Sequence, residues 1–439
     1  MRIALNQLAP IENSKMQALA SSYATKAKIF LLHRLSCGYL FLGILVFSSW
    51  VSAQTYSDSN QQFNECLSRI GSQAKTEGIS DKTVQKVLGN AKHNQRVIDL
   101  DRRQPEFTQT FANYFNTRIN DERVQRGREL LTRHRALLNK IQQETGVPAQ
   151  YLVSFWGLET NYGGHFGDWS VTDSLATLAC DPRRSSFFTQ ELLNAMRIVD
   201  AGDISPDRMI GSWAGAMGHM QFMPSTFLRY AKDMDGDGRR DLWGSIPDAM
   251  GSAANFLRQL GWITDLNWGQ EVRLPPSFDY SLAGRDQMPS QAEWAKLGVA
   301  TISGTPLAPT EQKAALLVPA GHQGPAFLVT KNFYIIMRWN RSEFYALSVG
   351  HLADRIAGAA ALQRTPPADT AKITREQVRQ LQIDLSALGI DAGEADGVLG
   401  SMTRQAISRF QQQTQRIADG HLDVTLLTAI REAASTLSR

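Results

Sequence analysis

Apolar residues recur at intervals of three and four positions from residue 61 to about residue 262. The segment that contains Leu130, Leu131, Leu137, Leu138 and Ile141 is typical of this spacing. It predicts amphipathic helices that bury one face in a common core. Turns are expected where glycine, proline and aspartate interrupt the pattern, at Gly163-Gly164, Asp181-Pro182, Ser205-Pro206 and 235–238.

The pattern changes between residues 270 and 340. Short apolar runs at 314–318, 326–329 and 333–339 stand among proline- and glycine-rich stretches. Short apolar runs bounded by turn residues predict strands, so we expect a small α/β insert over 270–340. Helical spacing returns after residue 340. Residues 359–371 contain a Pro-Pro pair and predict an extended linker before a compact helical module over 372–437.

The first 53 residues have the pattern of an export signal. Basic side chains between positions 26 and 34 precede an apolar run over 35–51, which ends in Val51-Ser52-Ala53. This order predicts a signal peptide, residues 1–53, cleaved after Ala53. The alternative is an uncleaved anchor, but the run is shorter than the ~20 residues of a bilayer span. The long polar start leaves Met16 open as the true first residue.

Composition narrows the function classes. A chain of 439 residues with 43% hydrophobic side chains is long and apolar enough for two or three folding units. Its formal net charge of +4 comes without a dense stripe of lysine and arginine, so we predict no nucleic-acid partner.

Export would leave Cys66 and Cys180 in an oxidising compartment, because Cys37 lies within the predicted signal. Two cysteines in that setting predict a disulfide. Two separate buried thiols are the alternative. Cys37 itself is not a lipoprotein attachment site, since it precedes most of the apolar run.

Glu159 is the first candidate for chemistry. It stands in the last turn of an apolar helix that begins near Tyr151 and is expected to end at Gly163-Gly164. Desolvation by neighbours such as Trp156 and the negative end of the helix dipole would both raise its pKa. A carboxyl that stays protonated near neutral pH can protonate a leaving oxygen. A glutamate that simply faces solvent is the alternative.

A second candidate segment is Gly211–Thr226, which is dense in glycine and alanine with amides and hydroxyls between them. Small residues let a bulky ligand approach the backbone. Ser212 and Gln221 could then hydrogen-bond the amide of a sugar. Tight packing of helices through glycine and alanine is the alternative.

Four segments resemble, in order and at similar spacing, the lytic transglycosylase B family of bacterial cell-wall enzymes. They are Gly157–Gly163, Asp181–Phe188, Ser212–Ser225 and Phe333–Tyr345. The resemblance extends from about Phe63 to Ile356. It implies a lysozyme-like, mainly α-helical catalytic domain over 61–358 and a periplasmic location.

The resemblance also implies roles for individual side chains. Glu159 matches the catalytic glutamate of the family. Positions that match its cleft residues are Tyr114, Arg183, Arg184, Ser212, Gln221, Asn340 and Tyr345. The chain departs from the family at Phe187, Phe256 and Trp339, which stand where tyrosines are expected. These departures put the family's hydroxyl contacts with substrate in doubt, while aromatic stacking on sugar rings could be kept.

The implied reaction cleaves the bond between N-acetylmuramic acid and N-acetylglucosamine and forms 1,6-anhydromuramic acid without water. Glu159 would act first as acid and then as base, with the muramyl 2-acetamido group stabilising the cation. Most glycosidases instead pair two carboxylates. Two alternatives stay open: a muramidase that uses water, and a scaffold that binds the wall without cutting it. No cofactor is expected for catalysis.

A third feature is an acidic loop that begins at Asp233. It has aspartate at positions 1, 3, 5 and 9 and glycine at position 6 of an EF-hand loop. Position 12 is Gly244, so Asp248 is the expected substitute for the usual glutamate. The predicted ligands of a structural Ca²⁺ are Asp233, Asp235, Asp237, the carbonyl of Arg239 and Asp248. A solvated turn is the alternative.

Residues 372–437 resemble the three-helix peptidoglycan-binding domain that accompanies many wall hydrolases. A tethered module of this kind raises the effective substrate concentration. We therefore expect an exported, monomeric, mainly α protein. Its order would be a lysozyme-like domain with an α/β insert, a linker, and a wall-binding domain. Its partner would be the peptidoglycan glycan strand, with membrane contact only if the N-terminal segment stays uncleaved.

Overall fold

The computed structural model describes residues 60–103, 109–367 and 373–437, so the predicted signal peptide lies outside the described residues. Helices α3 to α18 and strands β1 to β6 all belong to one compact unit, Cys66–Arg439. Among the described residues, no helix is both long and apolar enough to cross a membrane.

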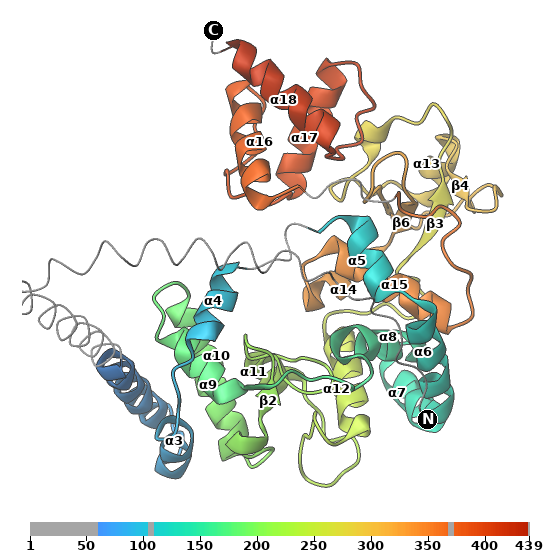
Figure 1. Ribbon diagram of the computed structural model, residues 1–439. Coiled ribbons are helices and arrows are strands. Elements are labelled where there is room, and N and C mark those ends of the chain that lie inside the picture. Colours follow the sequence, from blue (N-terminus) through green and yellow to red (C-terminus); the bar gives the residue numbers. More distant parts are fainter. Residues whose placement is uncertain (1–59, 104–108, 368–372, 438–439) are drawn as a thin grey trace, which may run out of the picture. The chain divides into compact units, whose positions relative to one another are not determined.

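Helices dominate the region that the sequence predicts to be helical (Figure 1). After helical residues up to 76 come α3 (Asp81–Leu88), α4 (Gln95–Arg103), α5 (Phe111–Arg118), α6 (Asp121–Arg133), α7 (Arg135–Thr145) and α8 (Ala149–Thr160). Side-chain caps fix several of the starts. Ser80, Thr110 and Asn120 each accept a hydrogen bond from a backbone N–H of the first turn of the helix that they precede.

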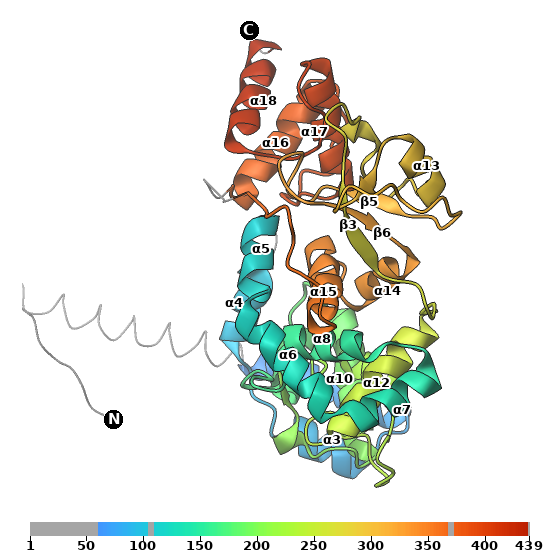
Figure 2. The same cartoon turned by 90° about the vertical axis from the view of Figure 1, so that its right-hand side faces the viewer.

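Helix α8 lies in the core of the helical domain, and nearly all of its side chains are buried. It packs along α15 (Glu343–Ile356), which lies beside it in Figures 1 and 2. The Ser154 hydroxyl donates to the Val349 carbonyl at 2.7 Å, which joins the two helices across the core. A helix that is apolar on all sides is stable only when it is enclosed by others.

The next helices of this domain are α9 (Val171–Ala179), α10 (Ser185–Asp200), α11 (Pro224–Tyr230) and α12 (Ile246–Gln259). Strand β1 (Trp169–Ser170), just before α9, pairs antiparallel with β2 (Ile210–Gly211), which lies between α10 and α11. Cys180, which follows α9, is placed opposite Cys66 in disulfide geometry, with a Cα–Cα distance of 5.9 Å. A bond here would fasten the helix that contains Cys66 to the end of α9.

The predicted α/β insert is a four-stranded antiparallel sheet with one short helix (Figure 2). The strands are β3 (Gly269–Arg273), β4 (Ala300–Thr301), β5 (Ala315–Leu317) and β6 (Ala326–Val329), in the order β4-β3-β6-β5, and the helix is α13 (Gln291–Lys296). Trp294 fills the core of the sheet with Val272 and Leu328. Its indole N–H donates to the Ala314 carbonyl at 2.8 Å.

The insert ends earlier than the predicted limit at residue 340. Residues Lys331–Trp339 form helix α14, which packs on α15 in the helical domain. Thr330 caps this helix and also donates to the Asn267 carbonyl at the edge of the sheet. The apolar run 333–339 was ambiguous between strand and helix, because a short apolar run has no period of its own.

The C-terminal module consists of α16 (Arg375–Ala387), α17 (Ser401–Gln413) and α18 (Val424–Leu437), with its own apolar core. The buried Gln382 amide joins its parts, because it donates to Val398 and Thr403 and accepts from Gly397. A separate core of this kind is what defines a domain.

The linker and the module both contact the insert. Backbone N–H groups of Gln363 and Arg364 donate to the Glu271 carboxylate at 3.0 and 2.9 Å. His322 donates its backbone N–H to Asp419 at 2.9 Å, and its Nδ1 lies 2.7 Å from the same carboxylate oxygen. The first part of the predicted spacer is therefore bound to strand β3, and the module is docked on the insert.

Candidate active site

Glu159 lies in the last turn of α8, as predicted, and its side chain is partly exposed. The helix ends at Thr160 in a different way from the one predicted. The cap is Asn161 in the left-handed conformation, with φ of 50°, and Tyr162 and Gly163 come next with φ of 61° and 79°. The chain turns away from the helix before it reaches the glycine pair.

Tyr345 is brought to Glu159 from helix α15. Its hydroxyl donates a hydrogen bond to Oε1 of Glu159. Burial, and secondly the neighbouring carboxylate, raise the pKa of Tyr345 well above its usual value. The hydroxyl therefore keeps its proton over the whole physiological range and acts as a neutral donor to the carboxylate.

Tyr114 of α5 is the third predicted residue at this point. Its ring is 8% exposed and the guanidinium of Arg118 lies 3.7 Å from the ring centroid. Its ring lies 6.0 Å from that of Phe344, which precedes Tyr345 on α15, and Tyr114 is one of the groups that raise the pKa of Tyr345. Three predicted residues from α5, α8 and α15 thus meet at one site.

Ser212 and Gln221 lie in a compact turn between β2 and α11. The Ser212 side chain accepts the N–H of Ala216 at 3.0 Å. The Gln221 amide donates to the Phe166 carbonyl at 3.1 Å, and its φ is 47°. Both side chains hold the turn together, so their predicted contacts with substrate would have to add to these bonds.

The two predicted cleft arginines share a partner that the sequence did not indicate. Arg183 and Arg184 both form ion pairs with Asp101 of α4, whose carboxylate is buried. The Arg183 guanidinium also donates to the Asp101 carbonyl at 2.6 Å. Their first function is to join α4 to the start of α10, and their side chains remain partly exposed for a ligand.

The aromatic departures from the family pattern separate into two kinds. Phe187 is 50% exposed and free to contact a sugar. Phe256 is 7% exposed and packs edge-on against Trp339, which stacks on Phe155 at 4.3 Å between ring centroids. Phe256 therefore belongs to a buried aromatic cluster, and the expectation that it stacks on a sugar is wrong.

Asn340 is exposed at the start of the turn before α15. Its side-chain oxygen accepts the N–H of Ser342 at 3.1 Å, and Ser342 in turn caps α15. Asn340 thus sets where the helix that carries Tyr345 begins.

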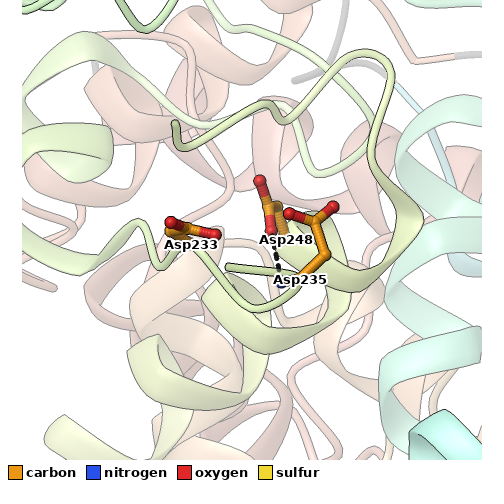
Figure 3. Close-up of side chains that lie close together, drawn as sticks. All are labelled: Asp233, Asp235 and Asp248. Atoms are coloured by element: carbon orange, nitrogen blue, oxygen red, sulfur yellow. Dashed lines mark hydrogen bonds between the residues drawn. The ribbon is translucent and has the colours of Figure 1, made fainter. Parts of the chain in front are cut away.

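The acidic loop gathers three of the four predicted aspartate ligands (Figure 3). One carboxylate oxygen from each of Asp233, Asp235 and Asp248 lies within 4.8 Å of the other two. Asp248, at the start of α12, is completely buried, and its burial raises its pKa. Asp237 is not one of this group, and its carboxylate accepts the N–H of Arg239 at 2.8 Å.

Two family models match the chain. The transglycosylase SLT domain matches residues 62–354, and the peptidoglycan binding domain matches residues 374–430. The first match spans well over half of the chain, so this protein belongs to the lytic transglycosylases that carry an SLT domain.

Individual relatives support the same assignment. Membrane-bound lytic murein transglycosylase B of Escherichia coli (strain K12) is 31% identical over 300 residues, which is 64% of this chain and 79% of that protein. The crystal structure of SltB3 from Pseudomonas aeruginosa in complex with NAG-anhNAM-pentapeptide is 42% identical. It covers 84% of this chain and 99% of its own, with a TM-score of 0.81. The lytic transglycosylase Slt35 of Escherichia coli in complex with calcium is 30% identical over 66% of this chain and 92% of its own, with a TM-score of 0.58.

The chain is thus a peptidoglycan lytic transglycosylase with a lysozyme-like catalytic domain and a C-terminal wall-binding domain. This confirms the predicted family, fold class and enzyme class. The individual site residues stay predictions, and so does the calcium ion.

Proposed function

We propose that Glu159 is the acid and base with which this enzyme cleaves the bond between N-acetylmuramic acid and N-acetylglucosamine. The observation that carries the proposal is the hydrogen bond from Tyr345 to Glu159. It fixes the carboxyl at the end of a buried helix, where it can face a bound glycan. General acid–base catalysis requires this kind of fixed geometry.

The reaction balances without water. The Glu159 carboxylic acid protonates the glycosidic oxygen while the C1–O bond breaks, and N-acetylglucosamine leaves with a free 4-hydroxyl. The muramyl 2-acetamido oxygen stabilises the positive charge at C1. The Glu159 carboxylate then removes the proton of the 6-hydroxyl, and O6 bonds to C1 to give the 1,6-anhydro sugar.

Tyr345 serves both steps as a neutral partner. It stays protonated, so it can donate to the carboxylate form of Glu159 without competing for the transferred proton. A hydrogen bond to the charged form lowers the pKa of a carboxyl. In this arrangement it stabilises the carboxylate that exists between the two proton transfers.

A substrate made of glycan strands with peptide stems is supported by the relative SltB3, whose structure contains NAG-anhNAM-pentapeptide. In this chain the partly exposed Arg183 and Arg184 and the exposed ring of Phe187 are the groups available to such a ligand. Guanidinium groups suit the carboxylates of a peptide stem. The ring offers a flat face to a sugar.

Calcium binding is the second part of the proposal. The three clustered carboxylates Asp233, Asp235 and Asp248 are hard oxygen ligands of the type that Ca²⁺ prefers. Like charges this close repel one another, and a divalent cation would remove the repulsion. The ion would hold the loop to the start of α12 and take no part in the reaction.

The same assignment supports the proposed export and the proposed disulfide between Cys66 and Cys180. An enzyme of this class acts on a polymer outside the cytoplasm, in the compartment where Cys66 and Cys180 would oxidise. Tryptic mapping of the mature protein with and without reductant would show whether the two cysteines are joined.

Product analysis tests the proposed reaction and separates it from the muramidase alternative. Purified sacculi are digested with the mature enzyme, and the soluble fragments are analysed by mass spectrometry. Anhydromuramic ends, one water lighter than reducing ends, are expected. Reducing ends as the main product would establish a hydrolase instead.

Glu159→Gln is the matched variant. It removes the proton-transfer group at nearly constant volume and should reduce cleavage by at least ~10²–10⁴-fold. Binding to sacculi and the melting temperature should be unchanged, which controls for misfolding. Activity within a few-fold of the wild type would show that Glu159 has another role.

A further inference from the structure

We propose that His219 is a positioning residue, which clamps the end of helix α8 onto the turn between β2 and α11 and so holds Glu159 in place for catalysis. The proposal rests on the role of Glu159 given above. His219 is 8% exposed and lies within the candidate segment Gly211–Thr226, where the sequence indicated no role for this side chain itself.

Three contacts connect His219 to the end of α8. The indole N–H of Trp156 donates to His219 Nδ1 at 2.9 Å. The Thr160 hydroxyl donates to the His219 carbonyl at 3.0 Å. The ring lies against Gly163, where an added Cβ would come within 2.5 Å of the ring carbon Cε1. These partners stand three residues before, one after and four after Glu159.

The other side of His219 is fixed to the neighbouring loop. Its backbone N–H donates to the Leu242 carbonyl at 2.8 Å, and the ring of Phe166 packs on it edge-on at 4.7 Å. Gln221, two residues later, also bonds to Phe166. The imidazole is therefore a rigid support, able to fix the direction of the Trp156 side chain.

The end of α8 needs such a support. Asn161 and Tyr162 are both in the left-handed region, which side chains with a Cβ seldom adopt. Strained residues of this kind persist only where the surrounding structure holds them. The Thr160 hydroxyl, which donates to His219, also accepts the N–H of Gly163 at 3.1 Å, so one network holds both ends of the strained segment.

The protonation state of His219 is compatible with this task. Burial lowers its pKa to about 4, against a smaller opposite effect of Asp241. The ring is neutral at the pH of the periplasm. Its Nδ1 accepts from Trp156, so the proton of the neutral ring is on Nε2.

The test compares three variants by steady-state kinetics on a soluble muropeptide oligomer. His219→Asn keeps a hydrogen-bonding atom near the position of Nδ1. His219→Leu keeps much of the volume and has no acceptor. Trp156→Phe removes the donor. We expect His219→Leu and Trp156→Phe to lower kcat by about 10- to 100-fold with KM little changed, because misplacement of the reacting group costs rate. His219→Asn should recover most of the loss.

The double variant Trp156→Phe, His219→Leu completes the cycle. If the hydrogen bond is what positions Glu159, the double variant loses no more kcat than either single variant. The proposal would be overturned if His219→Asn and His219→Leu lost kcat equally. It would also be overturned if the fold-loss of kcat in the double variant were the product of the two single losses. Variants that melt at a lower temperature but keep the wild-type kcat would overturn it as well. None of these results depends on Glu159→Gln, whose inactivity tests the proposed reaction separately.

Discussion

Two carboxylates, Glu159 in the last turn of α8 and Asp248 in the first turn of α12, lie at opposite ends of their helices and have different surroundings. The partner of Glu159 is the hydroxyl of Tyr345, which is 186 residues away in the chain. The partners of Asp248 are backbone N–H groups of Met234, Asp235 and Asp241, all within 14 residues. The surroundings of Glu159 are therefore assembled by the packing of distant helices, and those of Asp248 by a single local loop.

The difference matches the two proposed roles, proton exchange for Glu159 and cation binding for Asp248. Backbone N–H groups have fixed positions and hold Asp248 rigidly beside Asp233 and Asp235. The hydroxyl of Tyr345, by contrast, stays protonated and donates to Oε1 of Glu159 from a side chain on another helix. The surroundings of a carboxylate therefore decide its function more than the residue type does.

The largest effect on this comparison should come from Tyr345→Phe. It removes the donor to Glu159, and a hydrogen bond to a charged group contributes roughly 1.5–3 kcal/mol. We expect kcat to fall about 10-fold or more. The pKa of Glu159 should rise, because the carboxylate loses a hydrogen bond. The alkaline limb of the kcat–pH profile should then move to higher pH.

The matched control for this variant is Tyr280→Phe in the insert, which should change neither quantity. A pH profile identical to that of the wild type would show that Tyr345 does not act on the carboxyl.

Calcium should stabilise the folded protein through the acidic loop. A ligand that binds only the native state contributes about 2.7 kcal/mol at a hundredfold excess over its Kd, which corresponds to a rise of several degrees in Tm. Asp233→Ala with Asp235→Ala should abolish the rise, and Asp207→Ala, on an exposed aspartate elsewhere, should leave it. Coincident melting curves in chelator and in millimolar Ca²⁺ would identify the loop as an ordinary turn.

Asp354 lies on the same helix as Tyr345 and is a third carboxyl to set beside Glu159 and Asp248, with a neutral side-chain donor. It accepts the Trp268 indole N–H at 2.8 Å, and burial raises its pKa from 3.8 to about 6. The folded state therefore binds the proton more tightly than the unfolded state. Stability from this group is present below pH 4 and is lost as the pH rises through 6, by at most about 3 kcal/mol.

Asp354→Asn keeps the acceptor and removes the titration. Urea unfolding at pH 4.5 and 7.5 measures the free energy of unfolding of both proteins. The stability of the variant relative to the wild type should be higher at pH 7.5 than at pH 4.5. Burial lowers the pKa values of His219 and His351 to about 4, so these two groups make stability rise with pH, opposite to Asp354. Both histidines are present in the variant and the wild type, so their contribution cancels in the difference. A constant difference between the two proteins at both pH values would contradict the raised pKa.

The smallest effect is expected from truncation after Pro366, measured on a short soluble muropeptide. The residues around Glu159 all precede that point, so turnover should be nearly unchanged. On insoluble sacculi the truncated enzyme should be slower, because the wall-binding domain is lost. Equal losses on both substrates would show that the docked module influences the active site.

Asp419→Asn refines the truncation experiment. It weakens the contact with His322 and keeps the whole module. If a fixed position on the insert matters for attack on the wall, this variant should be slower on sacculi alone. If attachment alone matters, it should match the wild type.

Local features of this protein were readable from the sequence. The apolar spacing after Tyr151 predicted the helix α8, although its end was expected at Gly163-Gly164 and lies at Thr160. The turn residues around the sheet predicted short strands. The spacing of the acidic loop predicted the cluster of Asp233, Asp235 and Asp248, although the predicted set also held Asp237, which lies outside it. These local predictions succeeded because the residues that form a helix, a turn or a ligand loop lie within a few positions of one another in the sequence.

Tertiary structure alone decided which distant groups meet. Nothing in the spacing indicates that Asp101 pairs with Arg183 and Arg184, or that Phe256 is enclosed by other rings. The same holds for the bond between Trp156 and His219. Such pairs depend on how helices pack after they form, and a buried polar group takes whichever partner that packing brings within reach. The sequence by itself determined the helices, the acidic loop and the family motifs, and packing determined the partners of the side chains on them.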